Sequence, residues 1–107
     1  KSIGSVSLWN LSWLHRRASI GIWLHSKYWN QGFAKRTLNL IQIIAFKHLK
    51  LHRLEAHIAF NNTRSVKLFE KCGFTREGVL QEYLNFNGTF HDAYLLACLN
   101  HDVDEDF

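Results

Sequence analysis

The chain has 107 residues, a length that suits one domain. Apolar residues make up 47% of it, enough for a packed core, yet no apolar run reaches the roughly 18–20 residues that span a bilayer. The formal charge is +4, although four acids crowd the segment 102–107, so the rest of the chain is more basic than the whole. Lys and Arg do not alternate with aromatic residues as in nucleic-acid binders, so we expect neither a nucleic-acid nor a membrane partner.

The first half of the chain predicts two strands and a long helix. Loose alternation of apolar and polar residues predicts a strand over 3–9 and a second strand over 18–24, and the polar segment 10–17 would connect them. After a small-residue turn, apolar residues recur at helical spacing over 37–49. This stripe comprises Ala34, Leu38, Ile41, Ala45 and Leu49, and is widened by Leu40, Ile44 and Phe46, so we expect a mostly covered helix.

The second half predicts a strand, a short helix and a hairpin. Alternation over 53–59 predicts a strand, and Asn62 is a good cap for a helix over 63–71. Gly73 would end this helix in a left-handed conformation, with Phe74 packing back on Phe69. The strongest hairpin signal is Asn87-Gly88, which would join strands over 79–86 and 89–99.

The predicted order is therefore β-β-α-β-α-β-β in one domain, 1–107, with an acidic tail at 102–107. A strand, helix, strand unit favours a parallel pair, whereas hairpins give antiparallel pairs. We predict an α+β fold with a mixed, partly parallel sheet, and with one helix on each face or both on one face.

The cysteines and histidines indicate no metal site. Cys72 and Cys98 lack metal or redox spacing and lie among apolar residues, so we expect buried thiols and a cytoplasmic, reducing location. His48 and His52 have helical spacing, but no acidic residue completes a set of ligands.

The turn before the long helix is a candidate anion site. Backbone N–H groups at the start of a helix point outward, and the helix dipole favours negative charge there. Gly32 and Ala34 carry little side chain, so a phosphate could approach the backbone closely. Taken alone, such a turn is more often a plain helix start than a phosphate site.

Several motifs, in order and spacing over nearly the whole chain, resemble the GNAT N-acetyltransferases. The run 28–36 (YWNQGFAKR) is similar to the family's acetyl-coenzyme A loop, Q/R-x-x-G-x-G/A, although Trp29 stands where Gln or Arg is usual. Asn62-Thr63-Arg64-Ser65, the run 68–74 (LFEKCGF) and Glu77-Gly78 resemble the family's later segment. Three further pieces resemble the branch of the family that acetylates the N-terminal amine of ribosomal proteins (RimJ/RimL type). They are Glu82-Tyr83-Leu84, Asn87-Gly88 and His91-Asp92.

The resemblance implies acetyl-coenzyme A as co-substrate and a set of residues that bind it. The strands 18–24 and 53–59 would splay apart and admit the pantetheine arm between them. The residues implied to bind the cofactor are Trp23, Leu24, Gln31, Gly32, Phe33, Ala34, Lys35, Arg36, Asn62 and Ser65. For Lys35 and Arg36, a solvated helix start is the equally open alternative.

The resemblance also implies two catalytic residues. Ser65 would protonate the leaving thiolate, unless it is an ordinary hydroxyl in a first helical turn. Glu82 would share a strand face with Leu80 and Leu84 if the strand is regular, and apolar neighbours would suit a general base for the amine. If the strand has a bulge here, or if this face lies at an exposed edge, Glu82 would no longer lie among apolar neighbours.

The sequence therefore predicts an acetyl-coenzyme A dependent N-acetyltransferase whose acceptor is a protein N-terminal amine. The alternatives are a small amine, such as a polyamine or an antibiotic, or a truncated module that binds coenzyme A or a partner without turnover. The family's first strand, two helices and second strand have no counterpart here, so we expect an N-terminally truncated fold. The strand over 3–9 would then lack a neighbour and form a homodimer through its open edge.

Overall fold

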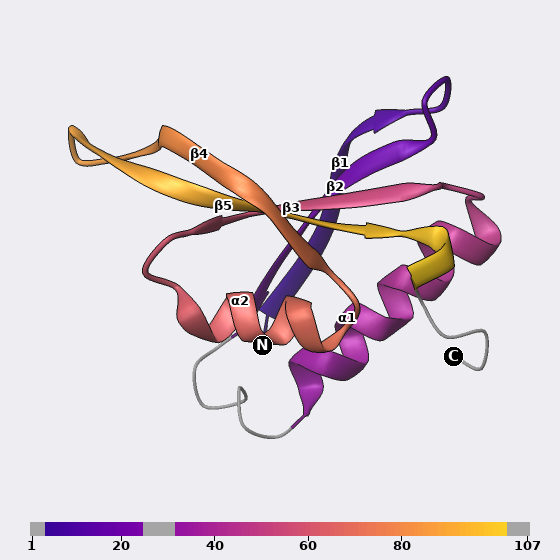
Figure 1. The fold of residues 1–107 in the computed structure, drawn as a ribbon. Coiled ribbons are helices and arrows are strands. Elements are labelled where there is room, and N and C mark those ends of the chain that lie inside the picture. Colours follow the sequence, from indigo (N-terminus) through magenta and orange to yellow (C-terminus); the bar gives the residue numbers. More distant parts are fainter. Residues whose placement is uncertain (1–3, 25–31, 103–107) are drawn as a thin grey trace.

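The structure, a computed structural model, describes residues 4–24 and 32–102 and consists of a five-stranded mixed sheet with two helices on one side (Figure 1). This α+β architecture and its element order confirm the prediction. The elements are β1 (Gly4–Ser12), β2 (Arg17–Leu24), α1 (Phe33–Ile43), the π-helical turn η2 (Ile44–His48), β3 (Arg53–Ala59), α2 (Thr63–Lys71), β4 (Thr75–Phe86), β5 (Thr89–Leu99) and the short η3 (Asn100–Asp102).

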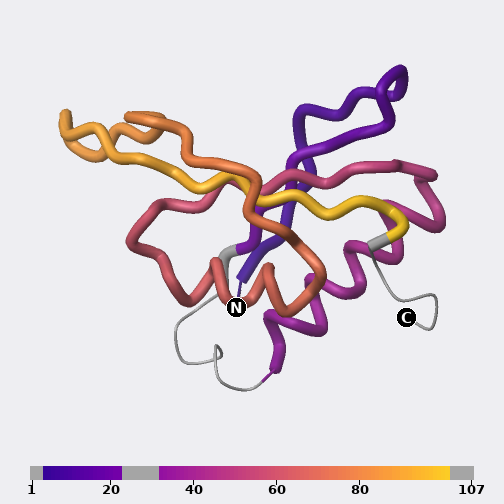
Figure 2. Tube along the Cα trace, in the orientation of Figure 1, coloured from indigo at the N-terminus to yellow at the C-terminus, as the bar shows by residue number. Residues whose placement is uncertain are grey.

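The sheet has the spatial order β1-β2-β3-β5-β4. Strands β2 and β3 are parallel, and the other neighbours are antiparallel. Figure 2 shows the β1–β2 and β4–β5 hairpins diverging on the side of the sheet away from the helices. As predicted, Asn87 and Gly88 both have positive φ and form the β4–β5 turn. No helix in the described part of the chain is long and apolar enough to cross a membrane.

The predicted strand bounds differ from the structure at two places. The first strand continues to Ser12 through an irregularity after Trp9, and it pairs with β2. Strand β1 is the edge strand of the sheet, and among the described residues its outer edge has no partner strand. Strand β4 begins at Thr75, ahead of the predicted start at Val79, because it continues to pair with β5 past the irregularity at Glu77.

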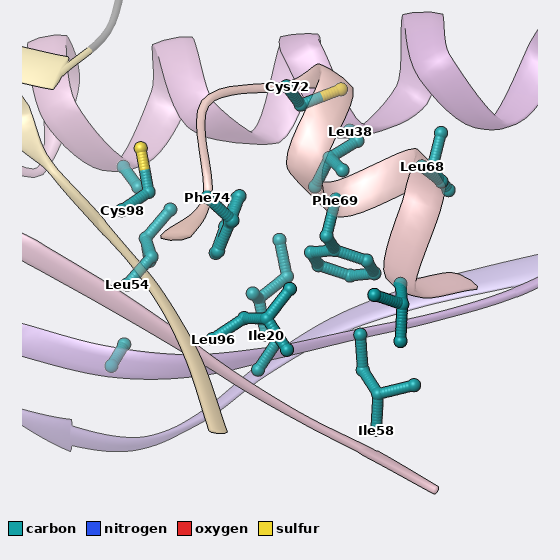
Figure 3. Close-up of a cluster of buried hydrophobic side chains, with 14 of the residues drawn as sticks. Ile20, Leu38, Leu54, Ile58, Leu68, Phe69, Cys72, Phe74, Leu96 and Cys98 are labelled. Carbon is teal, nitrogen blue, oxygen red and sulfur yellow. The ribbon is translucent and has the colours of Figure 1, made fainter. Parts of the chain in front are cut away.

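The core lies between the helices and one face of the sheet. In β3 burial alternates strictly, with Leu54, Ala56 and Ile58 turned toward the helices. Figure 3 shows Leu38 of α1 and Phe69 of α2 pointing toward Ile20 and Leu96 of the sheet. Both free cysteines, Cys72 and Cys98, are buried here, as predicted. The predicted cover of the first helix is only partial, because Leu40 remains 56% exposed on its outer side.

The end of α2 confirms the predicted left-handed termination. The Phe74 N–H donates to the Phe69 carbonyl (3.0 Å), and the Gly73 N–H donates to the Glu70 carbonyl (3.2 Å), which together form a Schellman motif. The rings of Phe69 and Phe74 meet edge to face, with centroids 4.9 Å apart. This ending turns the chain sharply from α2, which ends at Lys71, into β4, which begins at Thr75.

One polar side chain, Gln42 of α1, is fully buried within this core. Its Nε2 donates to the Cys72 carbonyl at 2.7 Å and contacts the Cys98 sulfur at 3.6 Å. The amide therefore joins α1 to the end of α2 and to β5. Its Oε1 has no hydrogen-bond partner among the residues that the structure describes.

An ion pair crosses the sheet on the face that the helices do not cover. The Arg53 guanidinium on β3 reaches past β5 to Glu77 on β4 with two hydrogen bonds, of 3.0 and 2.7 Å, and also bonds Glu55 at 2.8 Å. The Arg53 guanidinium holds the pKa of Glu77 below its usual range. The pair links the two strands that flank β5.

Replacing Glu77 with Gln is expected to lower the free energy of unfolding at neutral pH by at most about 1 kcal/mol, because water screens this partly exposed pair. The Glu77 pKa is lower in the folded chain than in the unfolded chain, so the stabilisation is present above the unfolded pKa. It is lost as the pH falls through the lowered, folded pKa. Urea unfolding of both proteins at neutral and at acid pH measures the difference.

The matched control is Glu70→Gln on the exposed side of α2. This variant removes the same charge without breaking the contact with Arg53, so its effect on unfolding at neutral pH should be smaller than that of Glu77→Gln. A Glu77→Gln effect that stays constant down to acid pH would contradict the assignment.

Candidate functional site

The sheet opens between β2 and β3. Their parallel pairing covers only Arg17 with Arg53, Ala18 with Leu54 and Ser19 with Glu55. Beyond Ser19, β2 continues beside β1, and beyond Glu55, β3 continues beside β5. The predicted splay of these two strands is confirmed, and it leaves backbone groups on both facing edges without ladder partners from each other.

A pocket of about 140 Å³ occupies this opening. Gly21 in β2 lies close to the ring of Trp9 in β1, since a Cβ on Gly21 would lie 2.9 Å from that ring. Side chains that contact the opening come from both strands and from α2. The lining residues are Ile20, Gly21, Ile22, Ala56, His57, Ile58, Ala59, Asn62, Ser65 and Phe69.

Helix α2 begins at this pocket, and its first turn is built as predicted. The Asn62 side-chain oxygen accepts a hydrogen bond from the Ser65 backbone N–H at 3.2 Å, which caps the helix. Ser65 is buried, with 7% exposure, and it lines the pocket together with Asn62. The cap uses the backbone of Ser65, so its hydroxyl is not committed to this bond.

The start of α1 is the turn in which the sequence predicts a phosphate site. Gly32 is the residue before the helix and has φ 76°, a left-handed conformation that glycine adopts without strain. The first backbone bond of the helix runs from the Arg36 N–H to the Gly32 carbonyl at 3.1 Å. Helix geometry leaves the N–H groups of Ala34 and Lys35, in the first turn, without a carbonyl in a preceding turn. These are the peptide groups that the sequence assigned to a phosphate.

A second pocket, of about 360 Å³, joins the start of α1 to the outer side of α2. Its walls are strongly basic, because Lys35 comes from α1 and three cations come from α2. The lining residues are Gly32, Ala34, Lys35, Arg64, Lys67, Leu68 and Lys71. Burial raises the pKa of the Cys72 thiol, and the nearby charge of Lys35 opposes that rise.

The structure places the other predicted cofactor residues less completely. Gln31 lies outside the described residues, and for Trp23 and Leu24 only the backbone in β2 is described. Phe33 is half-buried, and the Arg36 guanidinium lies 5.0 Å from its ring centroid. Arg36 therefore extends along the helix start rather than into the basic pocket, whose lining includes Lys35.

The expected setting of Glu82 is wrong. The pairing of β4 with β5 passes from Leu80 opposite Ala93 directly to Leu84 opposite His91. Glu82 lies in the resulting bulge, with φ 49°, and it is exposed rather than surrounded by Leu80 and Leu84. Its backbone N–H donates to Asp92 Oδ1 at 2.9 Å.

Several residues that were not among the predicted site residues lie at the site. His57 lines the pocket between the strands, and the Tyr83 ring from the bulge lies 5.3 Å from the His57 ring. The cations Arg64, Lys67 and Lys71 were not predicted to bind the cofactor. Their spacing of three, four and seven residues would have indicated one face of a helix.

Three comparisons relate the chain to known proteins. A profile of the acetyltransferase (GNAT) domain matches residues 1–75. The spermidine N(1)-acetyltransferase of Vibrio cholerae is 36% identical over 91 residues, which cover 85% of this chain and 53% of that protein. Bacillus subtilis YdaF, named as a candidate ribosomal N-acetyltransferase, is 30% identical over 99 residues, which cover 92% of this chain and 54% of that protein.

A solved structure agrees with these sequence matches. The crystal structure of the Vibrio cholerae spermidine N-acetyltransferase in complex with CoA and spermine aligns with a TM-score of 0.87 and 33% identity, covering 94% of this chain and 59% of that one. The chain spans about half the length of the curated relatives it matches. The domain profile, the relatives and the shared fold together show that this chain belongs to the GNAT acetyltransferase family.

Proposed function

We propose that this chain forms the coenzyme-binding part of an N-acetyltransferase that moves an acetyl group from acetyl-CoA to a primary amine. The observation that carries the proposal is the pocket between the parted strands β2 and β3, walled by the capped start of α2. Family membership supports the reaction class. The buried free thiols of Cys72 and Cys98 are consistent with a reducing, cytoplasmic setting.

The basic pocket fits the phosphates of coenzyme A. The N–H groups at the start of α1 offer donors for a diphosphate, and the helix dipole adds to them. The charges of Lys35, Lys67 and Lys71 stand around the same pocket and would neutralise the phosphate groups. Gly32, which has no Cβ, lets a ligand approach the main chain.

The pocket between the strands fits the pantetheine arm. Its walls combine apolar side chains with the unpaired strand edges, which suits a chain that alternates methylene and amide groups. Asn62 stands at the start of α2, where its side chain can contact such an amide while its oxygen caps the helix. The arm would end near Ser65 and His57.

The residues supply a donor and an acceptor of protons for acyl transfer. The amine nitrogen bonds to the acetyl carbon and the carbon–sulfur bond breaks. In this proposal the Ser65 hydroxyl gives its proton to the departing sulfur. The Glu82 carboxylate, which belongs to the exposed bulge, would take the proton that the amine loses. Orientation of the two reactants contributes the larger share of the rate.

Two classes of acceptor compete for the open side of the site. A polyamine is favoured by the relatives, since the Vibrio cholerae enzyme of 36% identity is a spermidine acetyltransferase. A protein N-terminal amine, which we predicted from the sequence, is favoured by the residues that resemble the RimJ/RimL branch, and YdaF supports that reading more weakly. We therefore place polyamines first and N-terminal peptides second, ahead of other small amines such as antibiotics.

Calorimetry with acetyl-CoA, followed by a thiol-release assay, tests the proposed function. Spermidine, spermine, an aminoglycoside and peptides with free N-termini serve as acceptors, and acetylated spermidine with no reactive amine serves as the blank. Thiol release with one acceptor class supports the reaction and identifies the acceptor. Binding without release for every acceptor would instead support a coenzyme-binding module without turnover.

Replacing Lys67 with Gln is expected to weaken acetyl-CoA binding about fivefold at low ionic strength, because one cation facing phosphate is lost. Salt should shrink the difference, since the contact is exposed. Lys50→Gln is the control, as Lys50 lies exposed beyond the far end of the α1–η2 helix. If calorimetry gives the Lys67 and Lys50 variants equal affinities for acetyl-CoA, α2 does not contribute to the phosphate site.

Ser65→Ala and Glu82→Gln are each expected to lower kcat about a hundredfold, because each removes one proton-transfer group. The Kd for acetyl-CoA should hardly change. The helix cap survives in Ser65→Ala, since the Asn62 oxygen binds the backbone N–H. Thr63→Ala, which removes a hydroxyl from the same first turn outside the pocket lining, is the control. A variant that keeps its full kcat loses its assigned role.

We also propose that β1 pairs with a second copy of the chain. Among the described residues its outer edge has no partner strand, and Trp9, Leu11, Trp13 and Leu14 nearby are exposed. Sedimentation equilibrium should show a dimer whose dissociation constant rises when Ser7, exposed in the middle of β1, is replaced by Pro. A monomer at millimolar concentration would contradict this assembly.

A further inference from the structure

The bulge that carries Glu82 is held by one residue of the neighbouring strand. Between the pairs Leu80–Ala93 and Leu84–His91, β4 has three residues and β5 has only Asp92. The Asp92 carboxylate accepts the Glu82 N–H at 2.9 Å. Because Glu82 has φ 49°, a conformation that costs free energy for a residue other than glycine, a specific partner is needed to maintain it.

Asp92 also holds the turn that leads to α2. Its backbone carbonyl accepts the N–H of Phe60 at 3.2 Å, just after the end of β3. The same turn is closed by the Asn62 N–H, which donates to the Ala59 carbonyl at 2.9 Å, and it continues into the cap that positions Ser65. Asp92 therefore forms a side-chain hydrogen bond to the bulge that carries Glu82, and a backbone hydrogen bond to the turn that leads to Ser65.

The surroundings of Asp92 make this connection rigid. Asp92 is only partly exposed, and the adjacent His91 ring stacks on Phe60 at 6.0 Å and meets Phe86 at 5.3 Å. Tyr83, the next residue of the bulge after Glu82, places its ring 5.3 Å from His57 in the wall of the strand pocket. The bulge is thus attached to the pocket at Tyr83 and to β5 at Asp92.

From this geometry we infer that Asp92 is a positioning residue for acyl transfer, which fixes Glu82 relative to Ser65 without itself contacting the reacting atoms. Catalysis is sensitive to small displacements of a proton-transfer group, so release of the bulge should affect turnover more than binding. The inference rests on the proposed function in the experiments that measure turnover. It has a second readout that needs no turnover.

The first test compares Asp92→Ala with Asp92→Asn. Asn keeps an oxygen that can accept the Glu82 N–H, whereas Ala does not. We expect kcat to fall about tenfold or more in Asp92→Ala, with little change in the Kd for acetyl-CoA, and to return most of the way in Asp92→Asn. Equal loss in both variants would show that charge rather than position matters, and it would overturn the inference.

The matched control is Asn85→Ala in the same hairpin. The Asn85 side chain accepts the Gly88 N–H at 2.9 Å, so this variant also breaks one side-chain-to-backbone bond, but away from Glu82. Its kcat should stay at the parent value. A fall as large as that of Asp92→Ala would assign the effect to the hairpin as a whole and overturn the role of Asp92.

Amide hydrogen exchange at Glu82 gives the second readout. Exchange should be slow in the parent chain and in Asp92→Asn, and at least about tenfold faster in Asp92→Ala. If the parent chain shows no turnover, the proposed function fails while this measurement still decides whether Asp92 holds the bulge. Unchanged exchange in Asp92→Ala would overturn the inference. If Asp92→Ala does not fold, Asp92→Glu, which displaces the carboxylate by one methylene, takes its place in both tests.

Discussion

Parallel pairing between β2 and β3 lasts for only three residue pairs, and the geometry of the candidate site follows from this limit. The unmatched edges beyond Ser19 and Glu55 create the pocket, and the turn after β3 delivers Asn62 and Ser65 to its wall. A continuous parallel ladder would have closed the opening and satisfied its backbone groups internally. The gap is tolerated because β1 and β5 each satisfy the opposite edge of the strand that they border.

The two helices contribute differently to the site. Helix α1 offers its N-terminus and Lys35 to the basic pocket, whereas α2 offers a row of cations on one side and a capped, buried serine on the other. The distribution matches the two chemical ends of a coenzyme with a charged head and a reactive thioester. Four of the basic residues in the body of the chain, Lys35, Arg64, Lys67 and Lys71, line this pocket.

Much of this arrangement could be predicted because it depends on local signals. The Asn62 cap, the Gly73–Phe74 ending and the Asn87-Gly88 turn are each specified within a few residues. The setting of Glu82 could not be predicted, because a bulge depends on which residue of β5 stands opposite, and alternation in β4 alone implies a regular strand. The extra pairing of β1 beyond Trp9 and the exposure of Leu40 likewise depend on neighbours that are distant in sequence.

The buried amide of Gln42 fixes how α1 is aligned along α2. A slip of α1 by one turn, about 5.4 Å, would separate Gln42 from the Cys72 carbonyl and leave two dry polar groups unbonded, at a cost of about 1–3 kcal/mol each. Lys35 stands seven residues, or about two turns, before Gln42 on the same rigid rod. The backbone positions from which Lys35 of α1 and the cations of α2 extend are therefore fixed relative to one another. A phosphate bound there, as we propose, would meet cations carried on a frame that exists before the ligand arrives, and little of its binding energy would go into assembling that frame.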